Sequence, residues 1–257
     1  MGARLVRAIA LTQGPGRLQR IRAFVAARFD PQSHLGLGLT WRLAACALAV
    51  WAFSGLVDAV LDRETLVRLD LAIETWFHVH STPAGLAIFA GITQLGSPVV
   101  DVLIVVVSAY LLYRREFPLL VSWLGANLGG KVLEYVIKNT VHRSRPQYAA
   151  AYLNGASYSF PSGHTMGATV CYLMLAYLLS VRPGVTRRTK LIVHFIAAAI
   201  ILAVAFSRLY LGVHYPSDVA GGFVAGMAWL TACGATRHLI TRGQIYRSWE
   251  KSSVAMQ

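Results

Sequence analysis

Charged side chains are scarce in this sequence: they make up 14% of its 257 residues, and only 11 residues are acidic. In soluble domains about a quarter of the residues are charged. Hydrophobic residues reach 56%, and the mean hydropathy is positive. This composition excludes an ordinary soluble domain and predicts an integral membrane protein.

Cysteine is also rare. The three cysteines, Cys46, Cys171 and Cys233, each fall within an apolar stretch, where a thiol behaves as a small buried side chain. This placement argues against a disulfide framework or a cysteine metal site. His78 and His80 lie two residues apart, but neither a cysteine nor a third histidine accompanies them. We therefore predict no metal site and no cofactor.

The apolar residues are gathered into long runs. Six of these runs come close to or reach the length of about 17 to 25 residues that crosses a bilayer as a helix. They cover residues 43–61, 98–113, 117–137, 165–181, 191–206 and 219–236. The predicted fold class is all-α: a polytopic membrane helix bundle of about six transmembrane helices, with both termini on one side. Residues 62–97, between the first two runs, are predicted to form short interfacial helices on the outer side.

The flanks of these runs suggest three parts. Residues 1–42 form a basic N-terminal segment, 43–238 a membrane domain, and 239–257 a tail. Within the first part, residues 17–29 have apolar side chains at helical spacing among arginines, which fits either a helix on the inner membrane surface or a basic tail that fixes topology.

The formal net charge of +13 is divided among short loops. A nucleic-acid partner would require a gathered basic surface, so we expect anionic membrane lipids instead. If the termini are cytoplasmic, 17 of the 24 lysines and arginines lie inside, as the positive-inside rule requires. No eukaryotic retrieval signal or glycosylation sequon is found, and we expect a bacterial inner membrane with both termini in the cytoplasm.

The run over 117–137 ends with ionisable residues on one helical face. Lys131, Glu134 and Lys138 follow an i, i+3, i+7 spacing. A Lys131–Glu134 pair that reaches the membrane interface accounts for the first two. Lys138 lies seven residues before Arg145-Pro146 and calls for another explanation.

Three short motifs combine the polar residues of the second half. The first is K-x6-RP, from Lys138 to Pro146. The second is PSGH at 161–164, where Pro161 suits the first turn of a predicted helix. The backbone N–H groups of Ser162, Gly163 and His164 at its start suit an anion, and glycine leaves room for it. The third is SR-x5-H-x3-D at 207–218, which places His214 four residues before Asp218.

Each motif alone has an ordinary structural explanation, such as a capped helix start or a histidine hydrogen-bonded to an aspartate. In the predicted topology all three lie at the outer ends of spans three to six. They match the pattern of the type 2 phosphatidic acid phosphatase superfamily, membrane lipid phosphatases related to vanadium haloperoxidases. The sequence resembles this family over about residues 43–236.

The resemblance implies a role for each motif residue. His214 would be the nucleophile that forms a phosphohistidine, Asp218 would hold its imidazole, and His164 would protonate the leaving group. The phosphate would be bound by Lys138, Arg145, Ser162, Gly163 and Arg208. Phosphoryl transfer needs this kind of fixed positive charge and donors, and the implied reaction uses no metal.

The implied activity is hydrolysis of the terminal phosphate of a lipid phosphate or polyprenyl diphosphate at the periplasmic or outer face, with undecaprenyl diphosphate as the first substrate predicted. A phosphotransferase using the same site and a non-catalytic protein that binds anionic lipids are the alternatives. Between the fixed motif positions, His142 and Arg143 are predicted to be solvated loop residues, with contact to a second phosphate or headgroup as the alternative. His194 is predicted to be interfacial, and the tyrosines of 147–160 could line a lipid entrance.

Overall fold

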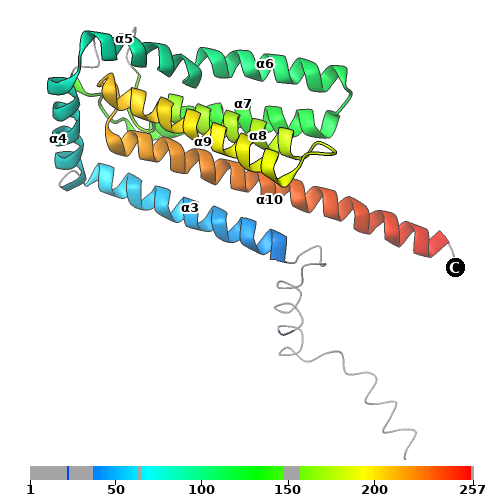
Figure 1. Cartoon of the computed structure of the whole chain (residues 1–257). Helices are drawn as coiled ribbons and strands as arrows, with labels where there is room; N and C mark the ends of the chain where they lie inside the picture. The colour runs from blue at the N-terminus through cyan, green and yellow to red at the C-terminus, as the bar shows by residue number, and fades with distance from the viewer. Residues whose placement is uncertain (1–21, 23–36, 63–64, 148–156, 256–257) are drawn as a thin grey trace, which may run out of the picture. The chain divides into compact units, whose positions relative to one another are not determined.

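The computed structural model describes residues 22, 37–62, 65–147 and 157–255, and the regular elements in this part of the chain are all helices (Figure 1). The predicted surface helix or tail over 17–29 lies, except for Arg22, outside the described residues. The elements are α3 (Leu37–Leu61), α4 (Thr65–His80), α5 (Pro83–Ile92), the 3-10 turn η1 (Thr93–Gly96), α6 (Pro98–Tyr113), α7 (Phe117–Val141), α8 (Gly163–Ser180), α9 (Arg187–Tyr210) and α10 (Pro216–Ala255).

All six predicted spans are helical. Among the described residues, four helical stretches are long and apolar enough to cross a membrane: Gly38–Leu61, Pro83–Tyr113, Arg187–Tyr210 and Pro216–Thr236. The second of these differs from the prediction, because α5 continues through η1 into α6. Together they form one apolar stretch of 31 residues, where the sequence suggested an interfacial helix followed by a separate span.

The chain divides into two compact units, 1–44 with 234–257, and 45–233. The predicted site residues all belong to the second unit. The ends of its helices follow from local sequence. Thr82 caps α5 by accepting a hydrogen bond from the Gly85 N–H, with Pro83 in the first turn, and Thr186 caps α9 in the same way through Thr189.

Helix α8 is the central element of the second unit. It packs against α7 and α9, and eleven of its 18 residues are buried. Trp123 of α7 is fully buried beside it and donates its indole N–H to the Ile104 carbonyl at 3.2 Å. Large apolar side chains on the outer faces of other helices stay exposed, including Trp51, Val105 and Phe195. These faces are the surfaces that lipid would cover.

Helix α4 differs from the others because its buried face is acidic. Asp70, Glu74 and Phe77, spaced at about one turn each, are its buried residues. Phe77 packs edge-on against Phe206 and Tyr210 of α9. Figure 1 shows α4 at the end of the helices where α9 turns into α10. The aromatic contacts therefore hold the Asp70 face of α4 against this end.

Candidate active site

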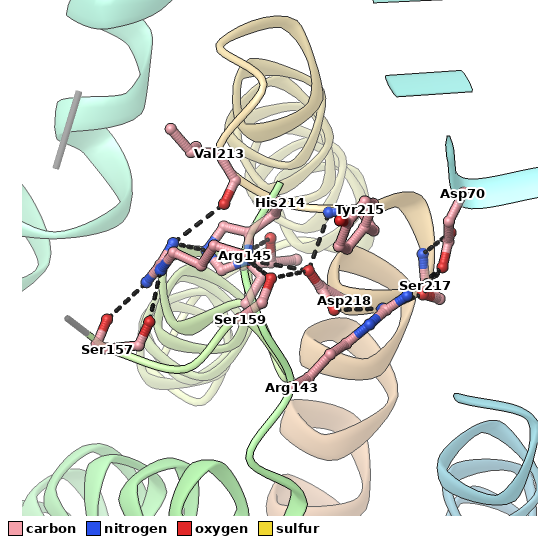
Figure 2. A network of polar contacts seen from close by, with 12 residues as sticks. Asp70, Arg143, Arg145, Ser157, Ser159, Val213, His214, Tyr215, Ser217 and Asp218 are labelled. Atoms are coloured by element: carbon pink, nitrogen blue, oxygen red, sulfur yellow. Dashed lines mark hydrogen bonds and ion pairs between the residues drawn. The ribbon is translucent and has the colours of Figure 1, made fainter. Parts of the chain in front are cut away.

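The three sequence motifs meet at one end of the second unit. The first motif continues from α7 into the loop that carries Arg145, the second begins α8, and the third ends α9 and forms the turn into α10. Arg145 links two of them, because its Nη1 lies 3.3 Å from His214 Nε2 and donates to the Val213 carbonyl at 3.0 Å (Figure 2).

His214 and Asp218 form a buried pair. Nδ1 of His214 lies 3.3 Å from Oδ2 of Asp218, and the two side chains are 1% and 0% exposed. The four-residue spacing brings the two side chains together as predicted, because Asp218 lies in the first turn of α10. Burial lowers the pKa of His214 to about 4, and the attraction of Asp218 opposes this only in part. The imidazole is thus neutral at pH 7.

The Asp218 carboxylate has further partners that the sequence did not reveal. Oδ2 accepts a hydrogen bond from the Tyr215 N–H at 2.9 Å and another from the Ser159 hydroxyl. Ser159 is fully buried and its Oγ also lies 3.4 Å from His214 Nδ1. These bonds fix the oxygen that faces the imidazole.

Arg143 is held between two carboxylates. Its Nη1 donates to Asp218 Oδ1 at 2.6 Å, and its Nη2 donates to Asp70 Oδ2 at 2.7 Å. Burial opposes the charge, but the attraction of the two carboxylates outweighs it and raises the pKa of Arg143 above its ordinary value. The prediction of a solvated loop residue is therefore wrong for Arg143. His142 is exposed as predicted, with its ring against Tyr158.

Arg145 is fixed by the backbone around it. Its Nε donates to the Ser157 carbonyl and its Nη2 to the Ser157 hydroxyl, both at 2.7 Å. Together with the bond to Val213, these contacts orient the guanidinium toward His214. Among the described residues, no acidic side chain is in direct contact with it. The positive charge of Arg145 remains available to an anion placed beside the imidazole.

The start of α8 has the geometry of an anion site. Ser162, the residue before the helix, is fully buried, and its N–H donates to the Asp218 carbonyl at 2.9 Å. Its hydroxyl makes no capping bond and accepts from Thr165 Oγ1 at 3.0 Å. A Cβ on Gly163 would lie only 2.0 Å from Oε1 of Glu134. Only glycine therefore fits this approach.

Glu134 connects this helix start to Lys138. Oε1 of Glu134 lies 2.8 Å from Nζ of Lys138. The predicted Lys131–Glu134 pair is wrong, because Lys131 instead forms an ion pair with Asp101 of α6. The i, i+4 spacing brings Glu134 and Lys138 together more directly than i, i+3 does for Lys131. The Glu134 carboxylate thus lies where the lysine and the glycine meet.

Arg208, at the end of α9, is buried and points to η1. Its Nη1 donates to Thr93 Oγ1 at 2.7 Å. Its Nε is buried and has no hydrogen-bond partner among the described residues. A buried guanidinium without a carboxylate in hydrogen-bond contact suits an anionic ligand.

His164 lies in the first turn of α8, just before the predicted span. Its side chain packs on Gly96, where a Cβ would lie 3.1 Å from that of His164. Burial lowers the pKa of His164 to about 3, and the positive charges of Arg208, Lys138 and Arg145 add to the effect. His164 thus interacts electrostatically with the motif residues of the other elements.

Two further histidines, His80 and His194, lie apart from this cluster. His80 stacks on Trp76, and His194 contacts the Lys190 carbonyl on the exposed face of α9. In the described part of the chain, no three His, Cys, Asp or Glu side chains are grouped as metal ligands would be. Most of the tyrosine-bearing stretch 147–160 lies outside the described residues.

Known proteins are similar to this chain in sequence and in fold. The sequence model of the PAP2 superfamily matches residues 116–242. The chain is 34% identical to phosphatidylglycerophosphatase B of Bacillus subtilis, over 75% of this chain and 89% of that protein. The chain belongs to the PAP2 superfamily.

One more relative and one solved structure are similar to the chain. The decaprenylphosphoryl-5-phosphoribose phosphatase of Mycobacterium tuberculosis is 32% identical, over 56% of this chain and 76% of its own length. A crystal structure of a transmembrane PAP2-type phosphatidylglycerolphosphate phosphatase from Bacillus subtilis matches with a TM-score of 0.65 at 31% identity. It covers 74% of this chain and 94% of the other.

Membership of the PAP2 superfamily confirms the predicted family, the all-α membrane fold and the class of enzyme, a lipid phosphate phosphatase. The chain is an integral membrane protein. The site also contains residues that the three motifs do not specify: Asp70, Thr93, Arg143 and Ser159. Of these, only Arg143 lies inside a motif stretch, so its position between Lys138 and Arg145 was the one available signal.

Proposed function

We propose that this PAP2 protein hydrolyses the terminal phosphate of a membrane lipid through a phosphohistidine on His214, without a metal ion. The observation that carries the proposal is the buried His214–Asp218 pair, in which Nε2 of His214 lies 3.3 Å from Nη1 of the Arg145 guanidinium. An imidazole that is oriented on one nitrogen and faces a cation with the other is suited to attack a phosphate that the cation binds.

Binding uses the cations around the imidazole. Arg145, Arg208 and Lys138 neutralise the non-bridging oxygens, and the Ser162 hydroxyl and Gly163 N–H donate to them from the start of α8. In the structure, Oε1 of Glu134 forms an ion pair with Nζ of Lys138 at 2.8 Å. A bound phosphate competes with this carboxylate for the lysine.

In the first step the lone pair of Nε2 attacks phosphorus. A P–N bond forms, the bond between phosphorus and the lipid oxygen breaks, and His164 gives a proton to that oxygen. Asp218 accepts the Nδ1–H bond and stabilises the positive charge that develops on the ring. The low pKa of His214, about 4, keeps the nucleophile unprotonated.

In the second step a water molecule attacks the phosphohistidine, His164 takes its proton, and the P–N bond breaks to release inorganic phosphate. With its pKa lowered to about 3, His164 is neutral before the substrate binds. The proton for the leaving group therefore arrives with a singly protonated phosphate, whose negative charge also raises the proton affinity of His164.

Substrate and location follow from likeness and charge. The similarity to phosphatidylglycerophosphatase B favours phosphatidylglycerophosphate, and undecaprenyl diphosphate stays our prediction from the sequence. We place the protein in a bacterial inner membrane, with both termini in the cytoplasm and the site toward the periplasm, because this orientation keeps most lysines and arginines inside.

The test is phosphate release by the detergent-purified protein in EDTA, from phosphatidylglycerophosphate, phosphatidic acid and undecaprenyl diphosphate. The parent is expected to release phosphate and His214→Ala to release none. Quenching in alkali is expected to trap a phosphoenzyme that acid then hydrolyses, as phosphohistidine does. Substantial turnover by folded His214→Ala would contradict the proposed nucleophile. Transfer of the phosphate to an added lipid instead of water would indicate a phosphotransferase.

A further inference from the structure

Asp70 of α4 binds two segments of the site although it belongs to none of the three motifs. Its Oδ1 accepts the Ser217 N–H at 3.0 Å, and its Oδ2 accepts from the Ser217 hydroxyl and from Arg143 Nη2. Ser217 is the second residue of α10, so its N–H has no acceptor within the helix. Asp70 therefore caps α10 from a separate helix, with its negative charge at the positive end of the helix dipole.

Arg143 carries this contact on to Asp218. One side of its guanidinium binds Asp70 at 2.7 Å and the other binds Asp218 Oδ1 at 2.6 Å (Figure 2). The planar fork of arginine can serve two carboxylates at once, which the single ammonium of a lysine cannot do in the same geometry. The Tyr215 ring covers the guanidinium, 4.4 Å from its central carbon.

The two oxygens of Asp218 have separate partners. Oδ1 faces Arg143, while Oδ2 faces His214, Ser159 and the Tyr215 N–H. A carboxylate bound on both oxygens cannot rotate about its bond without losing one set of partners. The direction in which Asp218 holds the imidazole thus depends on where Arg143 lies, and the place of Arg143 depends on Asp70.

Resting on the phosphatase reaction proposed above, we propose that Asp70 and Arg143 are positioning residues. Asp70 holds the Arg143 guanidinium and the start of α10, and Arg143 holds Asp218 Oδ1, so that Oδ2 keeps the His214 imidazole aimed at the phosphate. They act through Asp218. The pair makes α4, which lies outside the family's three motifs, a working part of the active site.

The first test compares Asp70→Asn and Arg143→Lys with the parent, using phosphatidylglycerophosphate and undecaprenyl diphosphate as substrates. Each change keeps the size or the charge of the side chain but breaks the two-carboxylate bridge. We expect kcat to fall about 10- to 100-fold, the effect of misplacing a reacting group by about 1 Å. We expect KM and inhibition by inorganic phosphate to change less than about threefold, because the cations that bind phosphate are unchanged.

A double variant tests whether the two residues act as one unit. Asp70→Asn combined with Arg143→Lys is expected to lower kcat no further than the more harmful single change, since either one already breaks the bridge. Multiplication of the two single effects would overturn the bridge. The rate at which the phosphoenzyme forms in a single turnover is expected to fall in parallel with kcat, because the misplaced group is the nucleophile.

Asp101→Asn is the matched control, because it breaks another aspartate–cation pair, the half-exposed one with Lys131. Its kcat is expected to equal that of the parent. A folded Asp70→Asn with the same kcat as the parent overturns the inference, as does a loss that appears in KM and phosphate inhibition alone. If Asp70→Asn does not fold, Arg143→Lys decides by the same criteria.

These outcomes separate the inference from the proposed function. A parent that releases no phosphate, or an active His214→Ala, overturns both. An active parent with an inactive His214→Ala and an unaffected Asp70→Asn overturns only the positioning role of Asp70 and Arg143.

Discussion

Two arginine–carboxylate clusters lie at opposite ends of the α7–α8 pair, and they differ in burial. At the end where α7 begins and α8 ends, Arg182 donates to both oxygens of Glu116 at 2.6 Å, and the two side chains are 27% and 22% exposed. At the other end, Arg143 joins two aspartates that are at most 1% exposed. The chemistry of the pairs is similar, but their contact with water is not.

The difference shows what each cluster contributes. An ion pair that keeps water nearby is worth about 0 to 1 kcal/mol, because solvent replaces a lost partner. Removing one partner of a buried pair costs about 3 to 5 kcal/mol, because the other charge stays desolvated. A membrane protein that buries three charges and a histidine at one end accepts a cost that packing alone does not require. We infer that the end with the buried cluster is built for chemistry, whereas the Arg182–Glu116 pair at the other end contributes only a weak surface interaction.

The largest expected effect comes from Asp218→Asn, which keeps the shape of the buried cluster and removes its central charge. The amide offers the wrong partner to the Nδ1–H, so the imidazole turns or changes tautomer. Phosphate release is expected to fall by about 1,000-fold or more, as for the equivalent change in a histidine–aspartate pair. The measurement is kcat with phosphatidylglycerophosphate. A loss smaller than tenfold in a folded variant would show that Asp218 does not orient the nucleophile.

Gly163→Ala is expected to lower kcat/KM by about 100-fold, the size of effect that a displacement of about 1 Å produces. The new Cβ would lie 2.0 Å from Glu134 Oε1, so either the carboxylate or the start of α8 has to move. The control is Gly125→Ala in α7, where a Cβ meets nothing within 4 Å. The same steady-state assay on both variants decides whether crowding at the start of α8, rather than any added methyl group, impairs the enzyme.

The buried His214–Asp218 pair also predicts how activity falls at acid pH. In the proposed mechanism His214 must be unprotonated to attack, and burial lowers its pKa to about 4. Protonation of His214 is therefore expected to leave kcat/KM level as pH falls toward about 4. Below that pH it is expected to lower kcat/KM about tenfold per pH unit. A profile from pH 3.5 to 8, with tryptophan fluorescence to verify folding, measures it. A midpoint near 6.5, the ordinary imidazole value, would mean that the pair is solvated.

The smallest expected effect belongs to the exposed cluster. Glu116→Gln removes the partner of Arg182, and we expect the free energy of unfolding to fall by no more than about 1 kcal/mol, with kcat unchanged. Chemical denaturation in mixed micelles and the phosphate assay measure the two quantities. A marked loss of turnover here would remove the distinction between the two ends.

The sequence was sufficient wherever neighbours along the chain decide the structure. The apolar runs became helices, Pro and Thr residues mark their starts, and the four-residue spacing brought His214 to Asp218. The motif residues Arg145, Ser162 and His214 meet because each lies at the end of a helix, and the ends of antiparallel neighbours adjoin.

The sequence was insufficient where partners are distant in the chain. Arg143 binds Asp70 across 73 positions and Arg208 binds Thr93 across 115, and no local spacing signals such contacts. Lys131 shows the same limit: Glu134 lies three residues away, yet its partner is Asp101, on the helix packed beside it. The helical turn into α6 was missed because 83–95 is apolar enough for either an interface or a span.

The unpaired Nε of Arg208 has a consequence for identifying the natural ligand. A buried charged donor without a partner among the described residues destabilises the protein by about 1 to 3 kcal/mol. A phosphate oxygen that accepts this N–H relieves the penalty, so binding raises the melting temperature. The melting temperature thus reports whether a phosphate group is bound, even when no turnover takes place. In the proposed mechanism His214→Ala cannot consume its substrate. Its melting temperature can therefore be used to screen whole lipid extracts for the headgroup that fits.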